Sequence, residues 1–418
     1  MPFPTRENPH SFLSQMADPS RTPVIVSAAR TPIGRYLGAL ASVSAPDLGA
    51  TAIREAIQRA RIGPEDVQEV IMGNVVQGGV GQAPARQAAI GSGLPATVSA
   101  VTINKVCGSG LKAVMLAAQA IKAGDAQVIV AGGQESMSNA PHYLYGLRSG
   151  VKFGDQTLVD GVIRDGLWCS FCDVHMGGHA EYTAKKANVS RQMQDEFAVQ
   201  SHRKAVAAID AGKFREEIVA VQIPGKKGPT IVDTDEGPRR DTSLDTLGKL
   251  RPAFASNGAR SDDLTVTAGN ASPMNDGASA LVVTSEEYAR AHGLTIMARI
   301  NAYATGAVEP QDLFFAPIEA VKRLMKRSGT KIGDYDLIEA NEAFAVQAIA
   351  DGTALGWEWD RVNVHGGAIA LGHPIGASGA RVLTTLLYAM RDRDEETGLA
   401  TLCLGGGDAV ALSVERMS

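Results

Sequence analysis

The chain has 418 residues, of which 44% are hydrophobic and only 5% aromatic, and it contains 45 glycines. This composition is typical of a globular α/β protein with an aliphatic core and glycine-built turns, and the length predicts two or three packed units. The formal net charge of -5 argues against general nucleic-acid binding, which requires a basic face.

The N-terminal segment 1–21 is polar and interrupted by prolines, and it lacks the apolar run of a secretory signal. We predict that it is a disordered tail. No apolar stretch approaches the roughly 20 residues that span a bilayer, so we expect no membrane partner. The chain has only four scattered cysteines, which favours a reducing compartment and therefore the cytoplasm.

Apolar strand-like runs alternate along the chain with amphipathic helical runs. The segments 23–29, 69–76 and 127–133 have the composition of buried strands, whereas 47–60 has helical spacing. Such alternation predicts βαβ units and largely parallel sheets.

The two ends of the chain repeat each other at a nearly constant offset. Three pairs of segments match: 62–74 with 332–341, 109–121 with 378–390, and 128–133 with 401–407. We infer a duplicated α/β half. The segment 109–121 is apolar on nearly every face, so each half is expected to contribute one buried helix to a shared centre.

The repeat divides the chain into two halves and an insert. We predict an N-terminal half over 22–138 with 273–295, and a C-terminal half over 296–418. The insert, 139–272, is richer in turns and charged residues. It is either a loop domain that covers a ligand or a solvated elaboration that binds none.

Three segments carry residues whose side chains can take part in catalysis. Cys107 precedes a predicted helix, where it is either a thiolate stabilised by the helix N-terminus or a small buried hydrophobe. His373 begins the mirrored helix, so the repeat symmetry brings a thiol and an imidazole together. Cys403 precedes the glycines 405–407, whose N–H groups are free to face a reacting oxygen. Taken singly, His373 could be a core or capping residue, and Asn341 a turn former.

The sequence resembles the thiolase family, the acetyl-CoA C-acetyltransferases and 3-ketoacyl-CoA thiolases, from about residue 22 to the C-terminus. Six motifs appear in the family's order: VCGSGLKA (106–113), HMGGHAE (175–181), GNASPMNDGA (269–278), NEAF (341–344), GHPIGASGA (372–380) and CLGGGD (403–408).

The resemblance implies a thiolase-like α/β fold with two duplicated βαβαβαββ halves in layered αβαβα packing, and a loop domain over coenzyme A. It implies reversible ping-pong acyl transfer: two acetyl-CoA give acetoacetyl-CoA and CoA, or a 3-ketoacyl-CoA is cleaved. The ligands are therefore acyl-CoA, acetyl-CoA and CoA. No cofactor is expected, because the thioester itself supplies the activation. The segment 140–155 is similar to a loop that pairs dimers, which implies a homotetramer.

The resemblance also implies roles for the catalytic residues. Cys107 resembles the acyl-accepting nucleophile, and His373 the residue that deprotonates it and later helps hold the thioester oxygen of the second substrate. Cys403 resembles the acid/base that handles the α-proton. Asn341 is similar to the asparagine that positions a water in the first oxyanion hole, and the N–H groups of Cys107 and Gly405 would form the second.

Further residues of the insert and of the C-terminal half resemble the substrate-binding set. His175 and Ser272 would lie along the pantetheine arm, with Leu167 and Met176 beside it. Arg239 would lie near the adenine or the phosphates, although the neighbouring Arg240 leaves that match one residue ambiguous. The wall near the reacting carbons would contain Ala343 and Phe344. For Leu167, Met176 and Phe344, ordinary core packing is an equally simple interpretation.

Several positions depart from the family pattern. His365 stands where asparagine is usual, so it could perturb the water near Asn341 or replace the asparagine's hydrogen bond. Asp408 would raise the pKa of the Cys403 thiol if it were buried and unpaired. His179 and Pro273 replace threonine and glycine, which bears on substrate preference.

A CxxC pair, Cys169 and Cys172, could be redox-active or half of a zinc site. No second CxxC exists in the chain, so His175 and His179 would have to complete the ligand set. Because the resemblance assigns His175 to substrate, we expect no metal.

Other activities remain as alternatives to short-chain chemistry. The segment 305–320, with Phe314 and Phe315, is unlike the usual short-chain sequence and is compatible with a longer-chain degradative thiolase. A non-catalytic lipid carrier could share the fold. A decarboxylating ketoacyl synthase is disfavoured by the thiol at Cys403, and a cysteine hydrolase by the need for water to reach the acyl-enzyme.

Overall fold

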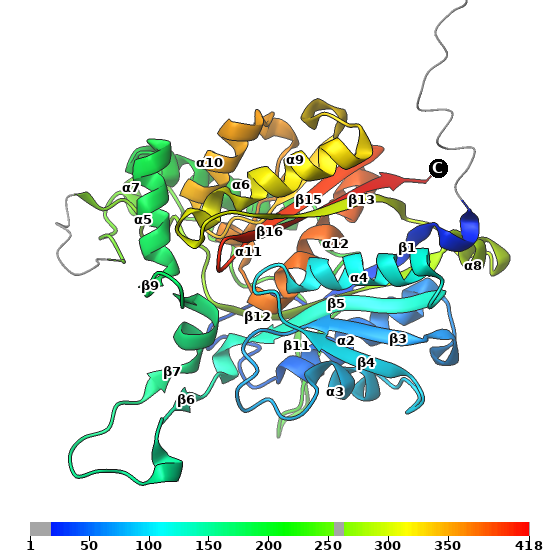
Figure 1. Ribbon diagram of the computed structural model, residues 1–418, viewed down its shortest axis with the longest axis horizontal. Coiled ribbons are helices and arrows are strands. Elements are labelled where there is room, and N and C mark those ends of the chain that lie inside the picture. The colour runs from blue at the N-terminus through cyan, green and yellow to red at the C-terminus, as the bar shows by residue number, and fades with distance from the viewer. Residues whose placement is uncertain (1–17, 255–262, 418) are drawn as a thin grey trace, which may run out of the picture.

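The computed structural model describes residues 18–254 and 263–417. Two α/β halves lie one above the other, and an insert lies along one side of both (Figure 1). Of the predicted tail, 1–17 lies outside the described residues, and Pro19–Arg21 forms a single helical turn, η1. None of the helices in the described ranges has the length and apolar character that a bilayer crossing requires.

The N-terminal half is a sheet with helices on both faces. The strands lie in the order β4-β3-β5-β12-β1, and a short strand, β2 (Gly34–Arg35), pairs with β12. The strands and helices are β1 (Pro23–Arg30), α2 (Ala45–Ala60), β3 (Glu69–Gly73), α3 (Pro84–Gly91), β4 (Ser99–Ile103), α4 (Ser109–Ala123), β5 (Val128–Ser136) and β12 (Asn275–Ser285).

The C-terminal half repeats this arrangement, in the strand order β14-β15-β16-β13. An isolated parallel bridge between Ile338 and Val362 stands where β4 pairs with β3 in the first half. The elements are β13 (Ala298–Ala307), α9 (Ala316–Ser328), β14 (Leu337–Ala340), α10 (Ala345–Leu355), α11 (Ala368–Leu371), α12 (Ile375–Arg393), β15 (Thr397–Leu404) and β16 (Asp408–Arg416), and α8 (Glu286–Ala291) links the halves. The predicted duplication is confirmed.

The expectation of largely parallel sheets is wrong. Among the described strands of the N-terminal half, β3 runs parallel to its neighbours β4 and β5. In the C-terminal half, β14 runs parallel to β15. In contrast, β12 and β16 are antiparallel to their neighbours. The reason is visible in the link from β15 to β16, where the three-residue turn 405–407 leaves no room for a crossover helix. The insert joins the equivalent strands β5 and β12.

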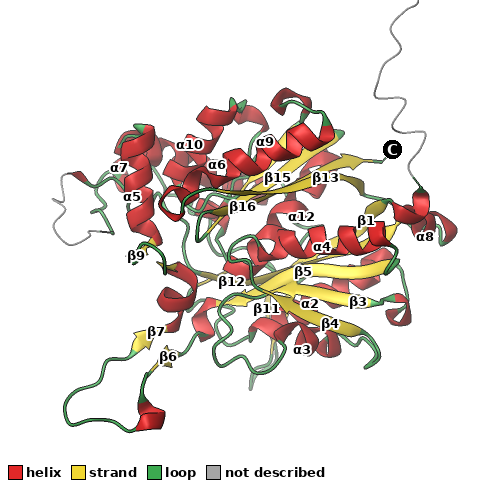
Figure 2. Cartoon of the chain, viewed as in Figure 1, coloured by secondary structure: helices red, strands yellow, loops and turns green. Residues whose placement is uncertain are grey.

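The middle layer consists of α4 and α12, which cross between the two parts of the sheet (Figures 1 and 2). A Cβ atom on Gly110 would lie 2.6 Å from the backbone N of Ala380, and one on Gly379 would lie 2.3 Å from the N of Leu111. Glycine is therefore required at this crossing, because any larger residue would separate the helices. The outer faces are covered by α2 and α3 on one side and by α9 on the other, which gives the predicted αβαβα layers.

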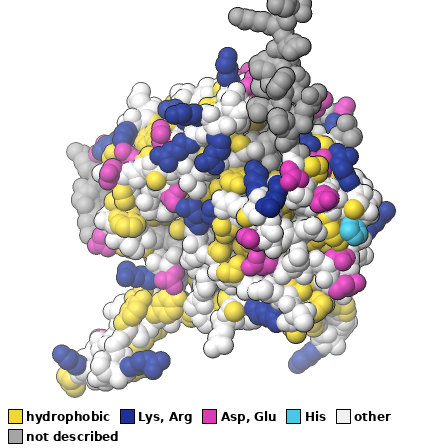
Figure 3. All heavy atoms as spheres, turned by 45° about the vertical axis from the view of Figure 1, so that its right-hand side comes forward, with side chains coloured by type: hydrophobic (Ala, Val, Ile, Leu, Met, Phe, Trp, Pro, Cys, Tyr) yellow, Lys and Arg dark blue, Asp and Glu magenta, His cyan; other side chains and the backbone are white. Residues whose placement is uncertain are grey.

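The insert contains a protruding arm and a compact group of helices. The short strands β6 (His142–Tyr143) and β7 (Val159–Asp160) form the base of the arm, and hydrophobic side chains are visible along it (Figure 3). The remaining elements are β8 (Trp168–Cys169), β9 (Val174–His175), α5 (Met176–Ala187), α6 (Arg191–Asp210), β10 (Val221–Ile223), β11 (Thr230–Val232) and α7 (Leu244–Leu247). The boundaries 139–272 stay a prediction.

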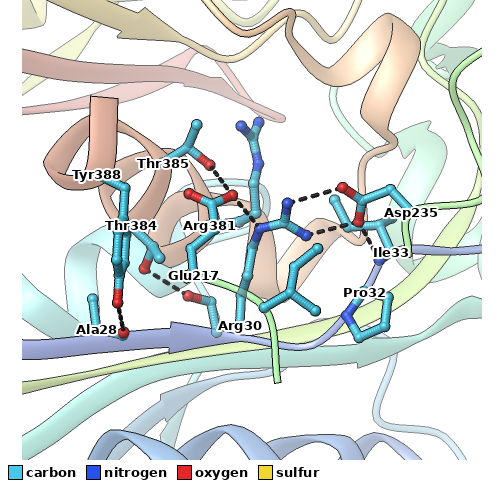
Figure 4. A network of polar contacts seen from close by, with 12 residues as sticks. Ala28, Arg30, Pro32, Ile33, Glu217, Asp235, Arg381, Thr384, Thr385 and Tyr388 are labelled. Atoms are coloured by element: carbon cyan, nitrogen blue, oxygen red, sulfur yellow. Dashed lines mark hydrogen bonds and ion pairs between the residues drawn. The ribbon is translucent and has the colours of Figure 1, made fainter. Parts of the chain in front are cut away.

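A buried charge network attaches the insert to the core (Figure 4). Arg30, at the end of β1, donates from Nε to Oε1 of Glu217 at 2.6 Å, and from its two Nη atoms to both carboxylate oxygens of Asp235 at 2.7 and 2.8 Å. All three side chains are buried. Since Glu217 and Asp235 belong to the insert, one guanidinium connects two separate segments of it to the sheet.

Candidate active site

A cavity of about 500 Å³ lies where the two halves meet the insert. The residues predicted for catalysis and substrate binding, with one exception, line it: Cys107, Leu167, His175, Met176, Arg239, Ser272, Ala343, Phe344, His373, Cys403 and Gly405. The exception, Asn341, is buried directly after β14 and does not line the cavity. Residues from opposite ends of the chain therefore converge on one space.

Cys107 lies in a strained turn before α4. Val106 has a φ of 46°, a left-handed conformation that is rare for a β-branched residue. The Ser109 hydroxyl holds this turn, because it accepts from the Lys105 N–H at 2.8 Å and donates to the Val106 carbonyl at 2.6 Å. Strain of this kind persists where the surrounding structure enforces it, as in sites that present a reactive side chain.

Of the two alternatives for Cys107, the electrostatics disfavour a thiolate stabilised by the helix N-terminus. Burial raises the pKa of the thiol to about 12, although the N–H groups of Cys107 and Gly405 act in the opposite direction. The charge of Glu135 raises the pKa further. Desolvation therefore outweighs the helix terminus, and the resting form of Cys107 is the neutral thiol.

His373 is a neutral base. Burial, followed by the positive charge of Arg381, lowers the pKa of its imidazole to about 3. Nδ1 lies 2.6 Å from the Ser378 hydroxyl, which itself donates to the Pro374 carbonyl at 2.9 Å. We assign the proton to Nδ1, because Ser378 has already used its only hydrogen; Nε2 then carries the free lone pair.

Cys403 lies near the end of β15, is buried, and faces the same cavity. Burial raises the pKa of this thiol well above its ordinary value, and the charges of Cys107 and Asp351 raise it further. The condition under which Asp408 would raise this pKa, burial without a partner, is not met, since the carboxylate is partly exposed and forms an ion pair with Lys105. Asp351, on α10, was missed because nothing in its local sequence indicates burial.

Asn341 has the environment of a residue that holds water. Its side chain is fully buried, and neither its amide oxygen nor its amide nitrogen has a hydrogen-bond partner among the described residues. Buried polar atoms without a protein partner are commonly satisfied by ordered water.

Aromatic rings form one wall of the cavity. Phe344 lies edge-on to Phe314 at 5.2 Å and to Phe254 at 6.0 Å between ring centroids, and Phe254 stacks on His175 at 5.0 Å. Nδ1 of His175 accepts from the Gly177 N–H at 3.0 Å, which leaves the other ring nitrogen for a ligand. The Ser272 hydroxyl donates to the Ala343 carbonyl at 2.9 Å.

The two adjacent arginines differ in their surroundings. Arg239 lines the cavity and its backbone N–H donates to Nδ1 of His202 at 3.1 Å, whereas Arg240 points to Asp210 at 2.9 Å. His202 and Arg35 also line this part of the cavity. The sequence analysis did not predict these two residues, because neither belongs to one of the six family motifs.

His365 is buried and packs against the insert. Its ring packs edge-on against Phe214 at 5.9 Å between centroids, and burial, followed by the charge of Arg393, lowers the pKa of its imidazole to about 4. The effect of His365 on the water near Asn341 stays a prediction.

Comparison with known proteins agrees with this geometry. Residues 23–287 match the family description "Thiolase, N-terminal domain", and 294–416 match "Thiolase, C-terminal domain". The chain belongs to the thiolase family, as the motifs predicted. It is accordingly an acyltransferase.

Individual relatives cover nearly the whole chain. An acetyl-CoA acetyltransferase of Cupriavidus necator is 56% identical over 394 residues, which cover 94% of this chain and 99% of the relative. One from Escherichia coli is 54% identical over 396 residues, with the same coverage. The crystal structure of the Bacillus anthracis acetyl-CoA acetyltransferase superposes with a TM-score of 0.92 at 38% identity, covering 95% of this chain and 99% of that one.

Proposed function

We propose that this enzyme condenses two acetyl-CoA molecules to acetoacetyl-CoA and CoA, and catalyses the reverse thiolysis, through an acyl-enzyme on Cys107. The observation that carries the proposal is the convergence of two neutral thiols and one neutral imidazole on a single cavity. The thioester supplies the activation, so the reaction needs no cofactor.

In the first half-reaction, Nε2 of His373 accepts the Cys107 proton, and the thiolate attacks the carbonyl carbon of the acyl-CoA. The tetrahedral intermediate collapses with cleavage of the bond between that carbon and the coenzyme A sulfur, and the departing thiolate takes the proton back from the imidazolium. The N–H groups of Cys107 and Gly405, which already act on the Cys107 sulfur, would stabilise the oxyanion.

In the second half-reaction, Cys403 acts as the base. The Cys403 thiol first passes its proton to Nε2 of His373, and its thiolate then removes the α-proton of acetyl-CoA. The resulting enolate is stabilised by the imidazolium of His373 and by a water held at Asn341. The enolate carbon attacks the acyl group on Cys107, the acyl–sulfur bond breaks, and the departing Cys107 thiolate takes the proton from the imidazolium, while Cys403 keeps the α-proton. Burial makes the Cys403 thiolate a strong base, because the neutral thiol is favoured there.

Binding of the coenzyme falls to the insert. The pantetheine arm would pass Leu167, His175, Met176 and Ser272, and Arg239 offers a charge to the phosphates or adenine. In this proposal Ala343 and Phe344 close the acyl end of the cavity.

We favour short acyl chains because the acyl end of the cavity is filled with aromatic rings. Phe314 is only 2% exposed and contacts Phe344, whereas Phe315 lies under Lys186, outside the cavity lining. The test compares thiolysis rates of acetoacetyl-CoA and longer 3-ketoacyl-CoA substrates. Acetoacetyl-CoA should react fastest, and Phe314→Ala should improve the longer chains relative to it. Faster turnover of long chains by the wild type would favour the degradative alternative.

A non-catalytic lipid carrier would not need the nucleophile. Incubation with acetyl-CoA followed by mass spectrometry should show an acetyl group on Cys107, and none at this position in Cys107→Ser. An unmodified Cys107 would favour the carrier.

We also propose a homotetramer in the cytoplasm. Five large hydrophobic side chains are exposed on the arm of 140–160, and their burial against a second dimer would stabilise association: Tyr145, Leu147, Val151, Phe153 and Leu158. Light scattering of Phe153→Ser should then show a smaller assembly than the wild type. The four free cysteines favour a reducing compartment.

A further inference from the structure

A second cluster of chemically reactive side chains lies outside the catalytic constellation. Cys169 ends β8, Cys172 lies in the turn that leads to β9, and His179 lies in the first part of α5. The two sulfur atoms and one ring nitrogen of His179 lie within 4.8 Å of one another. Tetrahedral zinc, with bonds of about 2.3 Å to sulfur and 2.0 Å to nitrogen, requires separations of about 3.6–3.8 Å, which small side-chain rotations can supply.

The environment of His179 points to a ligand. The residue is only 2% exposed, its Nδ1 lies 3.3 Å from the Gln311 carbonyl oxygen, and its Nε2 is buried with no hydrogen-bond partner among the described residues. A carbonyl at Nδ1 selects the tautomer with the proton there, so the lone pair is on Nε2. Metal-binding histidines are typically oriented in this way, by a carbonyl on the nitrogen that does not bind the metal.

The CxxC turn has the geometry of a metal-binding turn as well. The Cys172 N–H donates to the Cys169 sulfur at 3.4 Å, so the turn brings the two cysteines together. Cys169 is buried and Cys172 is exposed. One side of the cluster is therefore open to solvent, where a water molecule can complete four-fold coordination.

We propose that Cys169, Cys172 and His179 bind one zinc ion. Two thiolates and one imidazole match zinc in ligand softness, and the two negative charges neutralise the ion in a half-buried site. A disulfide between Cys169 and Cys172 is the competing use of these thiols. It would leave Nε2 of His179 buried and unpaired, whereas zinc satisfies all three groups.

The site changes the earlier expectation of no metal. That expectation counted His175 as a required ligand, but the ligand cluster does not contain it, and His175 lies on the cavity wall instead. Three ligands meet without it because β8 and β9 form a hairpin, which brings Cys169 next to the start of α5.

The zinc ion would hold in place the segment between Cys172 and His179, which lines the coenzyme-binding cavity. His175 and Met176 lie between Cys172 and His179 in the chain, so a metal that joins the turn to the helix fixes the segment that carries both. The turn also lies against the active-site glycines, since a Cβ on Gly406 would be 3.2 Å from the Phe171 ring. This consequence for binding rests on the proposed function, whereas metal binding does not.

The test measures metal content of the full-length protein, purified without chelator, by elemental analysis. We expect about one zinc per chain in the wild type and in Cys107→Ser, and less than about a tenth of that in Cys172→Ser and His179→Thr. His292→Thr, which replaces an exposed histidine directly after α8, is the matched control and should retain zinc. Comparable zinc in all variants, or none in the wild type, would overturn the proposal.

Two further measurements separate the alternatives. Replacement by cobalt(II) should produce a thiolate-to-cobalt charge-transfer band that Cys172→Ser loses, and added zinc should raise the melting temperature of the stripped wild type but not of that variant. Cys172→Ser should raise the KM for acetyl-CoA more than it lowers kcat. A disulfide would lower the mass of the wild-type chain by two hydrogens, and Cys169 and Cys172 would resist alkylation until they are reduced. That result would refute the zinc site.

Discussion

Replacement of Arg30 by methionine tests how the insert is attached to the core. Arg30 makes a bidentate pair with Asp235 and a further bond to Glu217, and the arginine is completely buried. Methionine fills a similar volume without charge, so Arg30→Met leaves two buried carboxylates uncompensated. Breaking a buried pair by removing one partner typically costs about 3–5 kcal/mol.

The same chain contains a matched exposed pair. Arg240 donates from both Nη atoms to the carboxylate of Asp210, at 2.9 and 2.5 Å, but its side chain is 64% exposed. Water solvates both charges after the substitution, so Arg240→Met should leave the stability unchanged. The two variants have the same chemistry and differ in burial.

The assay is thermal unfolding followed by circular dichroism. With an unfolding entropy of about 2.1 cal/mol/K per residue, the 418 residues give a loss of roughly 3–6 °C in melting temperature for Arg30→Met. Burial already raises the pKa of Glu217, against the charge of Arg30. Without that charge the carboxyl is protonated more readily, so the variant should lose further stability as the pH rises and Glu217 must ionise. Equal effects of the two substitutions would refute the reasoning.

Three further outcomes are expected at single residues. Cys403→Ser should retain acetylation of Cys107, measured by mass spectrometry, but lose condensation by roughly 10²–10⁴-fold, because only the α-proton transfer is affected; loss of acetylation would contradict the assigned roles. Asp351→Asn removes a charge that raises the pKa of Cys403, so alkylation of Cys403 should begin at lower pH, and an unchanged profile would exclude Asp351 as a cause. Burial lowers the pKa of His365 to about 4 in the folded protein. Below about pH 6.5 this histidine therefore takes up a proton in the unfolded chain but not in the folded one, and the free energy of unfolding falls as the pH falls. Between pH 7 and 5, His365→Asn should lose about 2 kcal/mol less free energy of unfolding than the wild type, measured by urea unfolding. An equal pH dependence in the variant would contradict the assignment.

The sequence by itself determined the family and the duplicated halves, and it identified residues that line one cavity. Local patterns were sufficient because turn glycines, apolar helices and reactive side chains occur together in short segments, and the repeat paired the helix that follows Cys107 with the helix that follows His373. The residues predicted for catalysis and substrate binding line the cavity, apart from Asn341, which is buried and does not line it.

Only the tertiary structure decided the electrostatics and the second cluster. Asp408 is close to Cys403 in sequence, but it pairs with Lys105. Besides burial, the carboxylate that raises the pKa of the Cys403 thiol is that of Asp351, on helix α10. The protonated state of Cys107 follows from desolvation by surrounding segments, and the meeting of Cys169 and Cys172 with His179 follows from a hairpin. Burial and charge pairing act through space, so residues distant along the chain control them, and no local pattern records those distances.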